Sequence, residues 1–236
     1  MENGLSMNDK KTWLVQLGLI LIILGTSVMV FASLAEDVVN HEELSTLDPI
    51  LGNRIITSTS QSGDRFFSLI TSWGDTLVFI VGTALIGMWL MRRKSWDRMI
   101  FLYVDVGGAA LLNLILKQIF VRPRPDYPLA YLTAPGFSFP SGHAMISVAF
   151  YGAIAYLSFA YLKRFRAKVL VSIGTLVISG FIGYSRVYLG VHYVTDVLAG
   201  WAAGTAWLAV CILVDQLHLH SEGRKKWESG KILGDQ

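Results

Sequence analysis

The chain alternates between long apolar stretches and short polar, charge-rich stretches. Six apolar runs qualify as candidate membrane spans, since a helical span needs about 20 apolar residues. They cover residues 13–34, 75–91, 99–117, 143–162, 168–185 and 194–217. Any single run could be a buried helix of a soluble protein, but six in 236 residues leave too little polar surface for that. The pattern therefore predicts an all-α, polytopic membrane protein with six transmembrane helices in one bundle.

Composition strengthens this prediction. Hydrophobic residues make up 53% of the chain and charged residues only 16%, whereas soluble domains are about a quarter charged. We expect a single membrane domain over residues 1–236, with its core at about 70–217. The first run is longer than the apolar part of a signal peptide, so we expect a retained span. The single cysteine, Cys211, lies inside an apolar run and is predicted to be a core residue, without an intrachain disulfide.

Basic residues concentrate on one side of the predicted spans. If the N-terminal side is the inside, 14 of the 20 Lys and Arg residues fall in inside segments. The positive-inside rule then predicts a multi-pass protein of the cell membrane, with both termini and a tail at 218–236 in the cytoplasm. The six basic residues on the outside are Arg54, Arg65, Lys117, Arg122, Arg124 and Arg186. Because topology disfavours basic residues there, these are candidates for ligand binding.

The segment at 36–68, between the first two runs, is predicted to lie outside. Its residues Leu47, Ile50, Leu51 and Ile55 recur at helical spacing. This spacing is typical of an amphipathic helix at the membrane interface. A role as a lid or lateral gate for a lipid tail is compatible with that position.

Polar residues interrupt the third run. We expect Asn113 to hydrogen-bond a neighbouring helix, and the Gly107-Gly108 pair to allow close helix packing. Asp105 has no evident partner in the sequence, and we assign it no role.

Three polar clusters fall on the predicted outside, and the first reads KQIFVRPRP from Lys117 to Pro125. Pro123 and Pro125 stiffen the loop around Arg124, so its guanidinium can be held ready for bidentate phosphate binding. For Arg122 we favour an interfacial role, in which the side chain reaches back to the membrane surface.

The second cluster, Pro140-Ser141-Gly142-His143, opens the fourth run. A helix start presents unpaired N–H groups and a partial positive charge, which suit an anion. Ser141 can cap the helix or donate to a phosphate oxygen, and Gly142 lets the backbone approach closely. With an ordinary pKa of about 6.5, His143 can supply a proton near neutral pH.

The third cluster runs from Ser185 to Asp196. Arg186 can bind an anion. His192 and Asp196 are four residues apart, so on a helix they share one face. The carboxylate can then hold one ring nitrogen while the other is free to attack. Taken alone, each of the last two clusters could simply be a polar helix start.

Together the clusters supply three cations, two histidines and one carboxylate on one side of the membrane. Phosphoryl transfer needs charge stabilisation above all, and these groups can provide it. The histidines could act as nucleophile and proton donor. Since no carboxylate cluster is available for a metal, the residues predict metal-independent phosphoryl transfer without a cofactor.

The three clusters resemble the signatures of the type 2 phosphatidic acid phosphatase superfamily. The matching residues are Lys117, Arg124, Pro125, Pro140, Ser141, Gly142, His143, Ser185, Arg186, His192 and Asp196. The resemblance covers about residues 70–217, and the size and layout look most like the bacterial phosphatidylglycerophosphatase B and undecaprenyl diphosphatase branch.

This resemblance implies a six-helix membrane fold and a phosphohistidine mechanism. His192 would attack phosphorus, Asp196 would orient it, and His143 would protonate the leaving oxygen. The phosphoryl oxygens would be held by Lys117, Arg124, Ser141, Gly142 and Arg186. Activity should then follow a bell-shaped pH profile, because His192 must be neutral and His143 protonated.

The expected substrate is a lipid phosphate at the outer face, such as phosphatidylglycerophosphate or undecaprenyl diphosphate. Neither nucleic acid nor an obligate protein partner is expected. Two alternatives use the same cationic pocket: a non-catalytic lipid-phosphate binding or transport protein, and a vanadate-dependent haloperoxidase. The paired histidines are superfluous for the first, and the membrane spans argue against the second.

Overall fold

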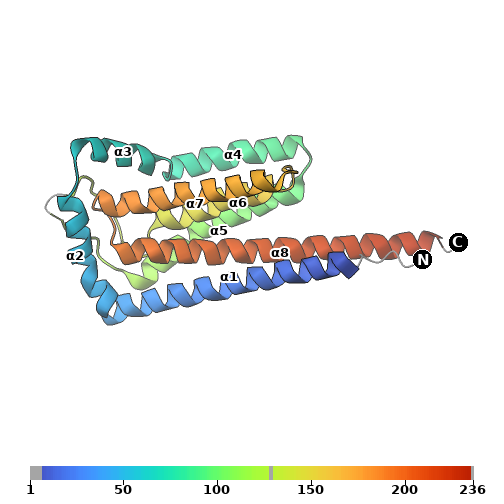
Figure 1. Cartoon of the computed structure of the whole chain (residues 1–236), viewed down its shortest axis with the longest axis horizontal. Helices are drawn as coiled ribbons and strands as arrows, with labels where there is room; N and C mark the ends of the chain where they lie inside the picture. The colour runs from blue at the N-terminus through green and yellow to red at the C-terminus, as the bar shows by residue number, and fades with distance from the viewer. Residues whose placement is uncertain (1–6, 128–129, 235–236) are drawn as a thin grey trace.

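The computed structural model describes residues 7–127 and 130–234, with side chains at residues 11–127 and 130–221. The described residues form eight helices and no strand, which confirms the predicted all-α class for this part of the chain. The helices are α1 (Met7–Asn40), α2 (Glu43–Thr57), α3 (Gln61–Ser72), α4 (Thr76–Arg92), α5 (Trp96–Phe120), α6 (Gly142–Ser158), α7 (Phe165–Tyr188) and α8 (Val194–Gly234). The long helices run along the long axis of the molecule, and α2 crosses one end of it (Figure 1).

Helix ends follow from local chemistry. Helix α5 ends at Phe120, and Val121 is left-handed with a φ of 47°. Pro123 then disfavours helical backbone at the residue before it. The chain therefore leaves α5 in a long loop, and this loop carries the first predicted cluster to the start of α6.

The start of α3 is fixed by a cap. The Ser60 hydroxyl accepts a hydrogen bond from the Gly63 N–H at 3.2 Å and caps the helix.

The chain is a multi-pass membrane protein by the length and apolarity of its helices. Four described helices qualify as spans, at Lys11–Asn40, Trp96–Phe120, Phe165–Tyr188 and Val194–Ser221. Helices α3 and α4 together make a fifth candidate, broken by a 40° bend. The predicted run at 143–162 corresponds to α6, which has only 17 residues. At a rise of about 1.5 Å per residue it is shorter than a full bilayer core, so the count of six spans stays a prediction.

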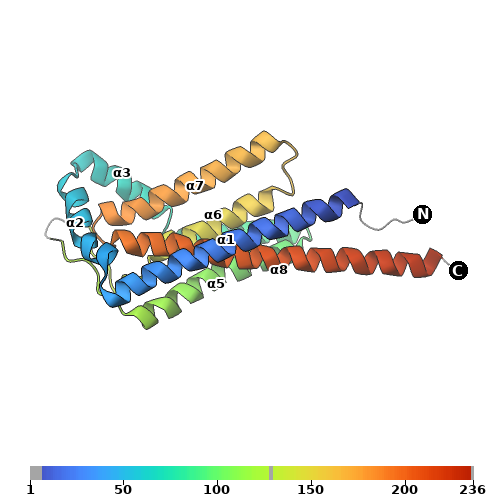
Figure 2. The same cartoon turned by 60° about the horizontal axis from the view of Figure 1, so that its bottom comes forward.

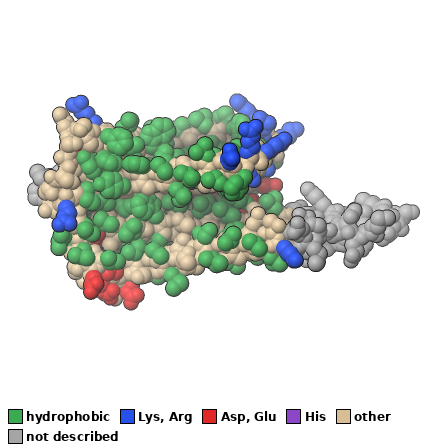
Figure 3. Space-filling view, in the orientation of Figure 1, with side chains coloured by type: hydrophobic (Ala, Val, Ile, Leu, Met, Phe, Trp, Pro, Cys, Tyr) green, Lys and Arg blue, Asp and Glu red, His purple; other side chains and the backbone are tan. Residues whose placement is uncertain are grey.

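The outer surface of the bundle is strongly apolar. Figure 3 shows hydrophobic side chains over the whole middle of the molecule, whereas Lys and Arg gather mainly near the ends. Exposed large side chains occur along most of the long helices and include Leu14, Ile22, Met29, Leu77, Leu85, Leu114, Ile119, Leu170 and Leu176. A soluble protein rarely exposes a continuous apolar surface of this size, so this apolar surface is the one that faces lipid.

Helix α6 forms the centre of the bundle. It packs against α5, α7 and α8, and small residues such as Ala144, Ala149 and Ala153 are fully buried along it. Small side chains let helix backbones approach closely in a membrane. The predicted core residue Cys211 is buried in the same region. Asn113 Nδ2 donates to the Pro140 carbonyl (3.2 Å) just before α6 and to the Met145 sulfur (3.7 Å) on α6, which confirms the predicted hydrogen bond to a neighbouring helix.

The predicted interfacial segment at 36–68 proves to be more than a surface helix. Helix α1 extends to Asn40, α2 follows, and α3 begins the broken span. Leu47, Ile50 and Leu51 are exposed, as an interfacial helix requires. However, α2 also has a buried face, and this face carries a carboxylate, that of Asp48.

The predicted tail at 218–236 continues the last span instead of leaving it. Helix α8 extends to Gly234, and the side chains after residue 221 lie outside the described part. Figure 1 shows the two ends of the chain at the end of the bundle opposite α2. The described basic residues of the α4–α5 and α6–α7 turns, Arg92, Arg93, Lys94, Lys163, Arg164 and Arg166, belong to this same end.

Candidate active site

The three predicted clusters meet at the end of the bundle that α2 crosses. Lys117 lies in the last turn of α5, Arg124 in the loop after it, and Ser141 at the cap of α6. Arg186 lies in the last turn of α7. His192 lies in the short turn between α7 and α8. Residues from α5, α6 and α7 and from two loops therefore converge on one place.

The centre of this place is the pair His192 and Asp196. The His192 Nδ1 lies 3.2 Å from the Asp196 Oδ2, and both side chains are almost fully buried. The same carboxylate oxygen accepts the Tyr193 N–H at 3.0 Å. Because the carboxylate can only accept, Nδ1 carries the proton, which leaves Nε2 unprotonated, with an electron pair that can accept a hydrogen bond or attack.

Burial decides the charge of this imidazole. It lowers the pKa of His192 to about 3, although the hydrogen bond to Asp196 acts in the opposite direction. The charges of Arg124 and Arg186 add to the lowering. The ring is therefore neutral at physiological pH, the state that a nucleophile needs.

The turn that carries His192 depends on Gly190. This residue has a φ of 81°, in the region that favours glycine. A Cβ there would also lie only 2.7 Å from that of Ala130. The tight turn at Gly190 brings Arg186 and His192 to one site.

Arg124 faces the free nitrogen of His192. Its Nη1 lies 3.1 Å from Nε2 and donates to the Val191 carbonyl at 2.8 Å. Its Nε donates to the Gly136 carbonyl at 3.0 Å, and Lys117 Nζ donates to the Phe137 carbonyl. The loop before α6 therefore holds both predicted cations in place with its backbone oxygens.

Two buried donors at the site have no partner in the described structure. Arg186 donates from Nη1 to the Thr71 hydroxyl at 2.6 Å, but its Nε makes no hydrogen bond. The Ser141 hydroxyl is also buried and unpaired. Buried polar atoms nearly always find a partner. A ligand that accepts hydrogen bonds would satisfy both.

The start of α6 adds backbone donors to the same place. Ser141 is the N-cap residue and its side chain makes no capping hydrogen bond. The first N–H groups of a helix have no partner within the helix and favour an anion. A Cβ on Gly142 would lie 2.9 Å from the Asn113 Oδ1, so the close approach of α5 to α6 requires glycine there.

His143 has a partner that the sequence did not indicate. Its Nε2 lies 3.2 Å from the carboxylate of Asp75, which is the N-cap residue of α4. The carboxylate can hold the ring in one orientation, and the role of His143 as a proton donor stays a prediction.

Arg122 is a correction to the sequence-based prediction. It does not reach for the membrane surface, because its side chain is only 12% exposed and is held by two buried carboxylates. Nη1 donates to Asp196 at 2.7 Å, and Nη2 donates to Asp48 at 2.8 Å. Burial opposes the charge on Arg122, but Asp196 and Asp48 outweigh it and raise the pKa of the guanidinium.

Comparison with known proteins agrees with this geometry. Residues 98–218 match the family model of the PAP2 superfamily, and this is just over half of the chain. The chain belongs to the PAP2 superfamily. Each of the three polar clusters lies inside the matched region.

Individual relatives of this PAP2 protein include two proteins named as phosphatases. It is 37% identical over 193 residues to phosphatidylglycerophosphatase B of Bacillus subtilis, covering 80% of this chain and 88% of the relative. It is 31% identical over 149 residues to an undecaprenyl-diphosphatase of Sulfolobus acidocaldarius, covering 59% of this chain and 64% of the relative. Among solved structures, a transmembrane PAP2-type phosphatidylglycerolphosphate phosphatase from Bacillus subtilis superposes with a TM-score of 0.76 at 30% identity. That match covers 82% of this chain and 96% of the other.

Two carboxylates of the PAP2 site were missed in the sequence, those of Asp48 and Asp75. Asp48 could have been noticed because Asp48, Gly52 and Ile56 form a row with four-residue spacing, but its partner Arg122 is 74 residues away. Among the described residues, no group of three or more His, Cys, Asp or Glu is placed to hold a metal ion. Around His192 the charged groups are instead mostly cations.

Proposed function

We propose that this PAP2 protein is a metal-independent membrane phosphatase that hydrolyses a phosphomonoester or diphosphate lipid through a phosphohistidine on His192. One observation carries the proposal. The free nitrogen of a neutral, buried, carboxylate-oriented histidine faces Arg124, and the partnerless donors of Ser141 and Arg186 belong to the same site. A phosphoryl group is the ligand that offers an electrophile to the nitrogen and oxygens to the donors.

The reaction would take place in two steps. In the first, Nε2 of His192 forms a bond to phosphorus while the bond to the lipid oxygen breaks, and His143 gives its proton to that oxygen. In the second, His143 takes a proton from water, whose oxygen attacks phosphorus and releases His192 and inorganic phosphate. Arg124, Lys117 and Arg186 balance the charge of the phosphoryl oxygens in both steps, and the Ser141 hydroxyl and the Gly142 N–H would donate to the same oxygens.

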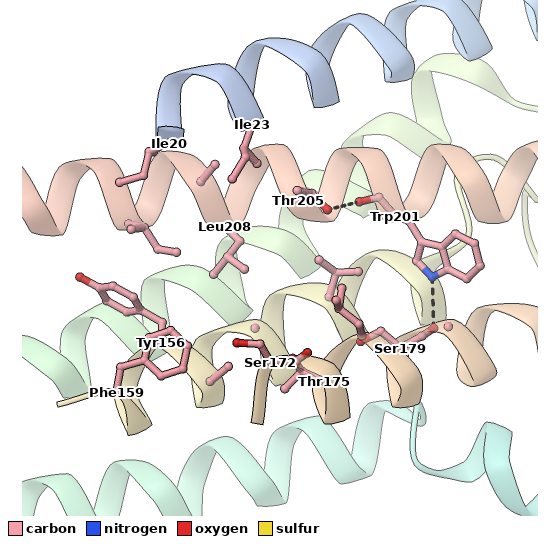
Figure 4. A pocket seen from close by; sticks show the side chains of 17 residues that line it. Ile20, Ile23, Tyr156, Phe159, Ser172, Thr175, Ser179, Trp201, Thr205 and Leu208 are labelled. Carbon is pink, nitrogen blue, oxygen red and sulfur yellow. Dashed lines mark hydrogen bonds between the residues drawn. The ribbon is translucent and has the colours of Figure 1, made fainter. Parts of the chain in front are cut away.

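An apolar cavity within the bundle supports a lipid substrate. It has a volume of about 650 Å³ and lies between α1, α6, α7 and α8, where Figure 2 shows α7 diverging from α8. Figure 4 shows Trp201, Thr205 and Leu208 on one wall. Trp201 lies about one and a half turns after Asp196, which is about 7.5 Å along α8. From Trp201 the cavity lining extends along the same helix to Ile212, about 16 Å further. The cavity is therefore placed to hold an alkyl chain that hangs from the phosphate site.

Filling this cavity should impair long-chain substrates selectively. Gly180 lines it, and a Cβ on Gly180 meets no atom within 4 Å. In Gly180→Trp we expect KM for a long-chain lipid phosphate to rise at least about tenfold, since each methylene displaced from apolar contact costs about 0.8 kcal/mol. Turnover of a short-chain, water-soluble lipid phosphate should stay within about twofold of the original.

Gly174 offers a matched control on the same helix. A Cβ there also meets no atom within 4 Å, but Gly174 does not line the cavity. Gly174→Trp should leave the KM of both substrates unchanged. If Gly180→Trp affects the two substrates equally, or if Gly174→Trp has the same effect, the cavity does not hold the lipid chain.

The proposed topology has six spans in one membrane domain, with α3 and α4 as one broken span and α6 as a short central one. The positive-inside rule assigns the basic end of the bundle, with both termini, to the cytoplasm. The phosphate site then faces outward, and the substrate is a lipid phosphate displayed in the outer leaflet. The chain needs neither nucleic acid nor an obligate protein partner for this reaction.

The names of the relatives give the substrates to test first. Purified protein should release phosphate from phosphatidylglycerophosphate, undecaprenyl diphosphate, or both, and a panel with phosphatidic acid and diacylglycerol diphosphate would rank them. Release should persist in EDTA, because arginine and lysine side chains fill the role of a metal. No release from any member of the panel would contradict the proposal and favour a protein that only binds lipid phosphate.

A further inference from the structure

A carboxylate from α2 reaches into the start of α8, next to Asp196. Asp48 is fully buried, and its Oδ1 accepts the backbone N–H of Thr195 at 3.1 Å. Its Oδ2 accepts the Thr195 hydroxyl. Asp48 on α2 thus caps the N-terminus of α8. Like an N-cap residue, it accepts a hydrogen bond from an N–H that has no partner within the helix, at the positive end of the helix dipole.

The same carboxylate holds Arg122, which in turn holds Asp196. Nη1 of Arg122 donates to the Thr195 hydroxyl at 2.8 Å as well as to Asp196, so that one guanidinium joins three partners. The Tyr193 ring covers the guanidinium, with 4.2 Å between its carbon and the ring centre. Each carboxylate oxygen of Asp196 therefore has an assigned direction: Oδ2 toward His192 and Oδ1 toward Arg122.

Charge explains why a second carboxylate is needed. When Nε2 of His192 bonds to phosphorus, the ring becomes positively charged, and the negative charge of Asp196 stabilises it. Arg122 alone would cancel that negative charge. With Asp48 present, two carboxylates share one guanidinium, and the group keeps one net negative charge behind the ring.

The surroundings of His192 make this net charge important. The ring contacts Arg124 from the loop after α5, and the charges of Arg124 and of Arg186 from α7 both lower its pKa. Lys117 from α5 acts on the same carboxylate, Asp196. Arg124 and Arg186 also act on His143, which pairs with Asp75. Arg124 and Arg186 oppose a positive charge on the imidazole. That charge must therefore be stabilised by the carboxylates on the Asp196 side of the ring.

We propose that Asp48 and Arg122 are positioning residues for the reaction, which orient Asp196 and set its effective charge. This inference rests on the proposed function of His192 as nucleophile. It makes α2 a fixed part of the catalytic centre and not a mobile lid, because α2 is tied to α8 through Asp48.

A double-mutant cycle tests the inference. Asp48→Asn keeps the side-chain shape and can still accept the Thr195 N–H, but it leaves Asp196 neutralised by Arg122. We expect kcat for lipid phosphate to fall about 10- to 100-fold, with KM within about twofold of the original. In the double variant Asp48→Asn, Arg122→Gln both charges are gone, so kcat should recover at least about fivefold relative to Asp48→Asn.

Asp37 provides the matched control, because it anchors α2 without touching Arg122 or Asp196. Its buried carboxylate accepts the N–H groups of Leu44 (3.1 Å) and Ser45 (2.6 Å) at the start of α2. Asp37→Asn should leave kcat nearly unchanged. If it lowers kcat as Asp48→Asn does, or if the double variant is less active than both single variants, the two residues only support the fold and the inference is wrong.

The outcome also separates this inference from the proposed function. Unchanged kcat in Asp48→Asn, in a preparation whose activity survives EDTA and is lost in His192→Ala, overturns the inference alone. Absence of phosphatase activity in the unmodified protein refutes the proposed function, and the inference with it.

Discussion

Replacing His192 with alanine is expected to abolish phosphate release, with a loss of at least about 10⁴-fold in kcat, as for other enzymes that lose their nucleophile. The physical reason is that His192 is the described imidazole whose unprotonated nitrogen contacts Arg124. Arg124 contacts Nε2 directly, and Lys117, Ser141 and Arg186 remain to bind phosphate. Lipid phosphate should therefore still bind the variant, with an affinity within about tenfold of the original.

The control for this variant is His218→Ala. His218 lies on α8 in the half far from the site, so its removal should leave kcat unchanged. Phosphate release and binding should be measured on the same purified samples, with thermal unfolding to show that both variants are folded. Full activity of His192→Ala would contradict the phosphohistidine mechanism, and loss of binding together with activity would show that the ring is needed for the fold of the site.

Replacing Asp196 with asparagine is expected to lower kcat about 10³- to 10⁴-fold, as when an orienting carboxylate is lost from a histidine nucleophile or base. Asparagine can donate a hydrogen bond to Nδ1, which would move the ring proton to Nε2, the nitrogen that must attack. The change also removes the charge that Arg122 and the ring share. Both effects act on the chemical step, so KM should change much less than kcat.

Asp215→Asn is the matched control on the same helix. Asp215 accepts a hydrogen bond from the Tyr156 hydroxyl at 2.6 Å, in the half of α8 remote from the site. We expect kcat of this variant to stay within about twofold of the original. If the two asparagine variants lose activity to a similar degree, the effect of Asp196 is structural and the assignment of its role is wrong.

The parts of the fold that depend on local pattern could be predicted from the sequence. Long apolar runs separated by basic turns indicate membrane helices. Four described helices coincide with those runs to within four residues, as at Phe165–Tyr188 for the predicted 168–185, whereas α1 and α8 extend beyond theirs. The three polar clusters were also recognisable, because each lies within about a dozen neighbouring residues. The four-residue spacing of His192 and Asp196 led to the prediction of their contact, which is present although His192 lies in the turn before α8 and not on the helix.

The rest depends on contacts between distant segments. The ion pair of Asp48 with Arg122 joins residues 74 apart, and that of His143 with Asp75 joins residues 68 apart. Neither hydrophobic periodicity nor the spacing of residues along the sequence predicts a contact between segments so far apart. The interfacial role predicted for Arg122 was wrong for this reason, since the side chain of an arginine beside a membrane span usually extends to the membrane surface. The exposed apolar stripe of α2 likewise hid the buried carboxylate on its opposite face.

The central claim, that His192 carries the phosphoryl group, is tested most directly by trapping it. In His143→Ala the first step should still proceed with a lipid diphosphate, whose leaving group is a phosphate and needs little protonation. The second step should be slow, because His143 no longer takes a proton from water. Protein incubated with a radiolabelled terminal phosphate should then accumulate a label that is stable to alkali and labile to acid, on the peptide containing His192. The added change His192→Ala should remove it. Label on any other residue, or steady turnover by His143→Ala without labelled protein, would contradict the account.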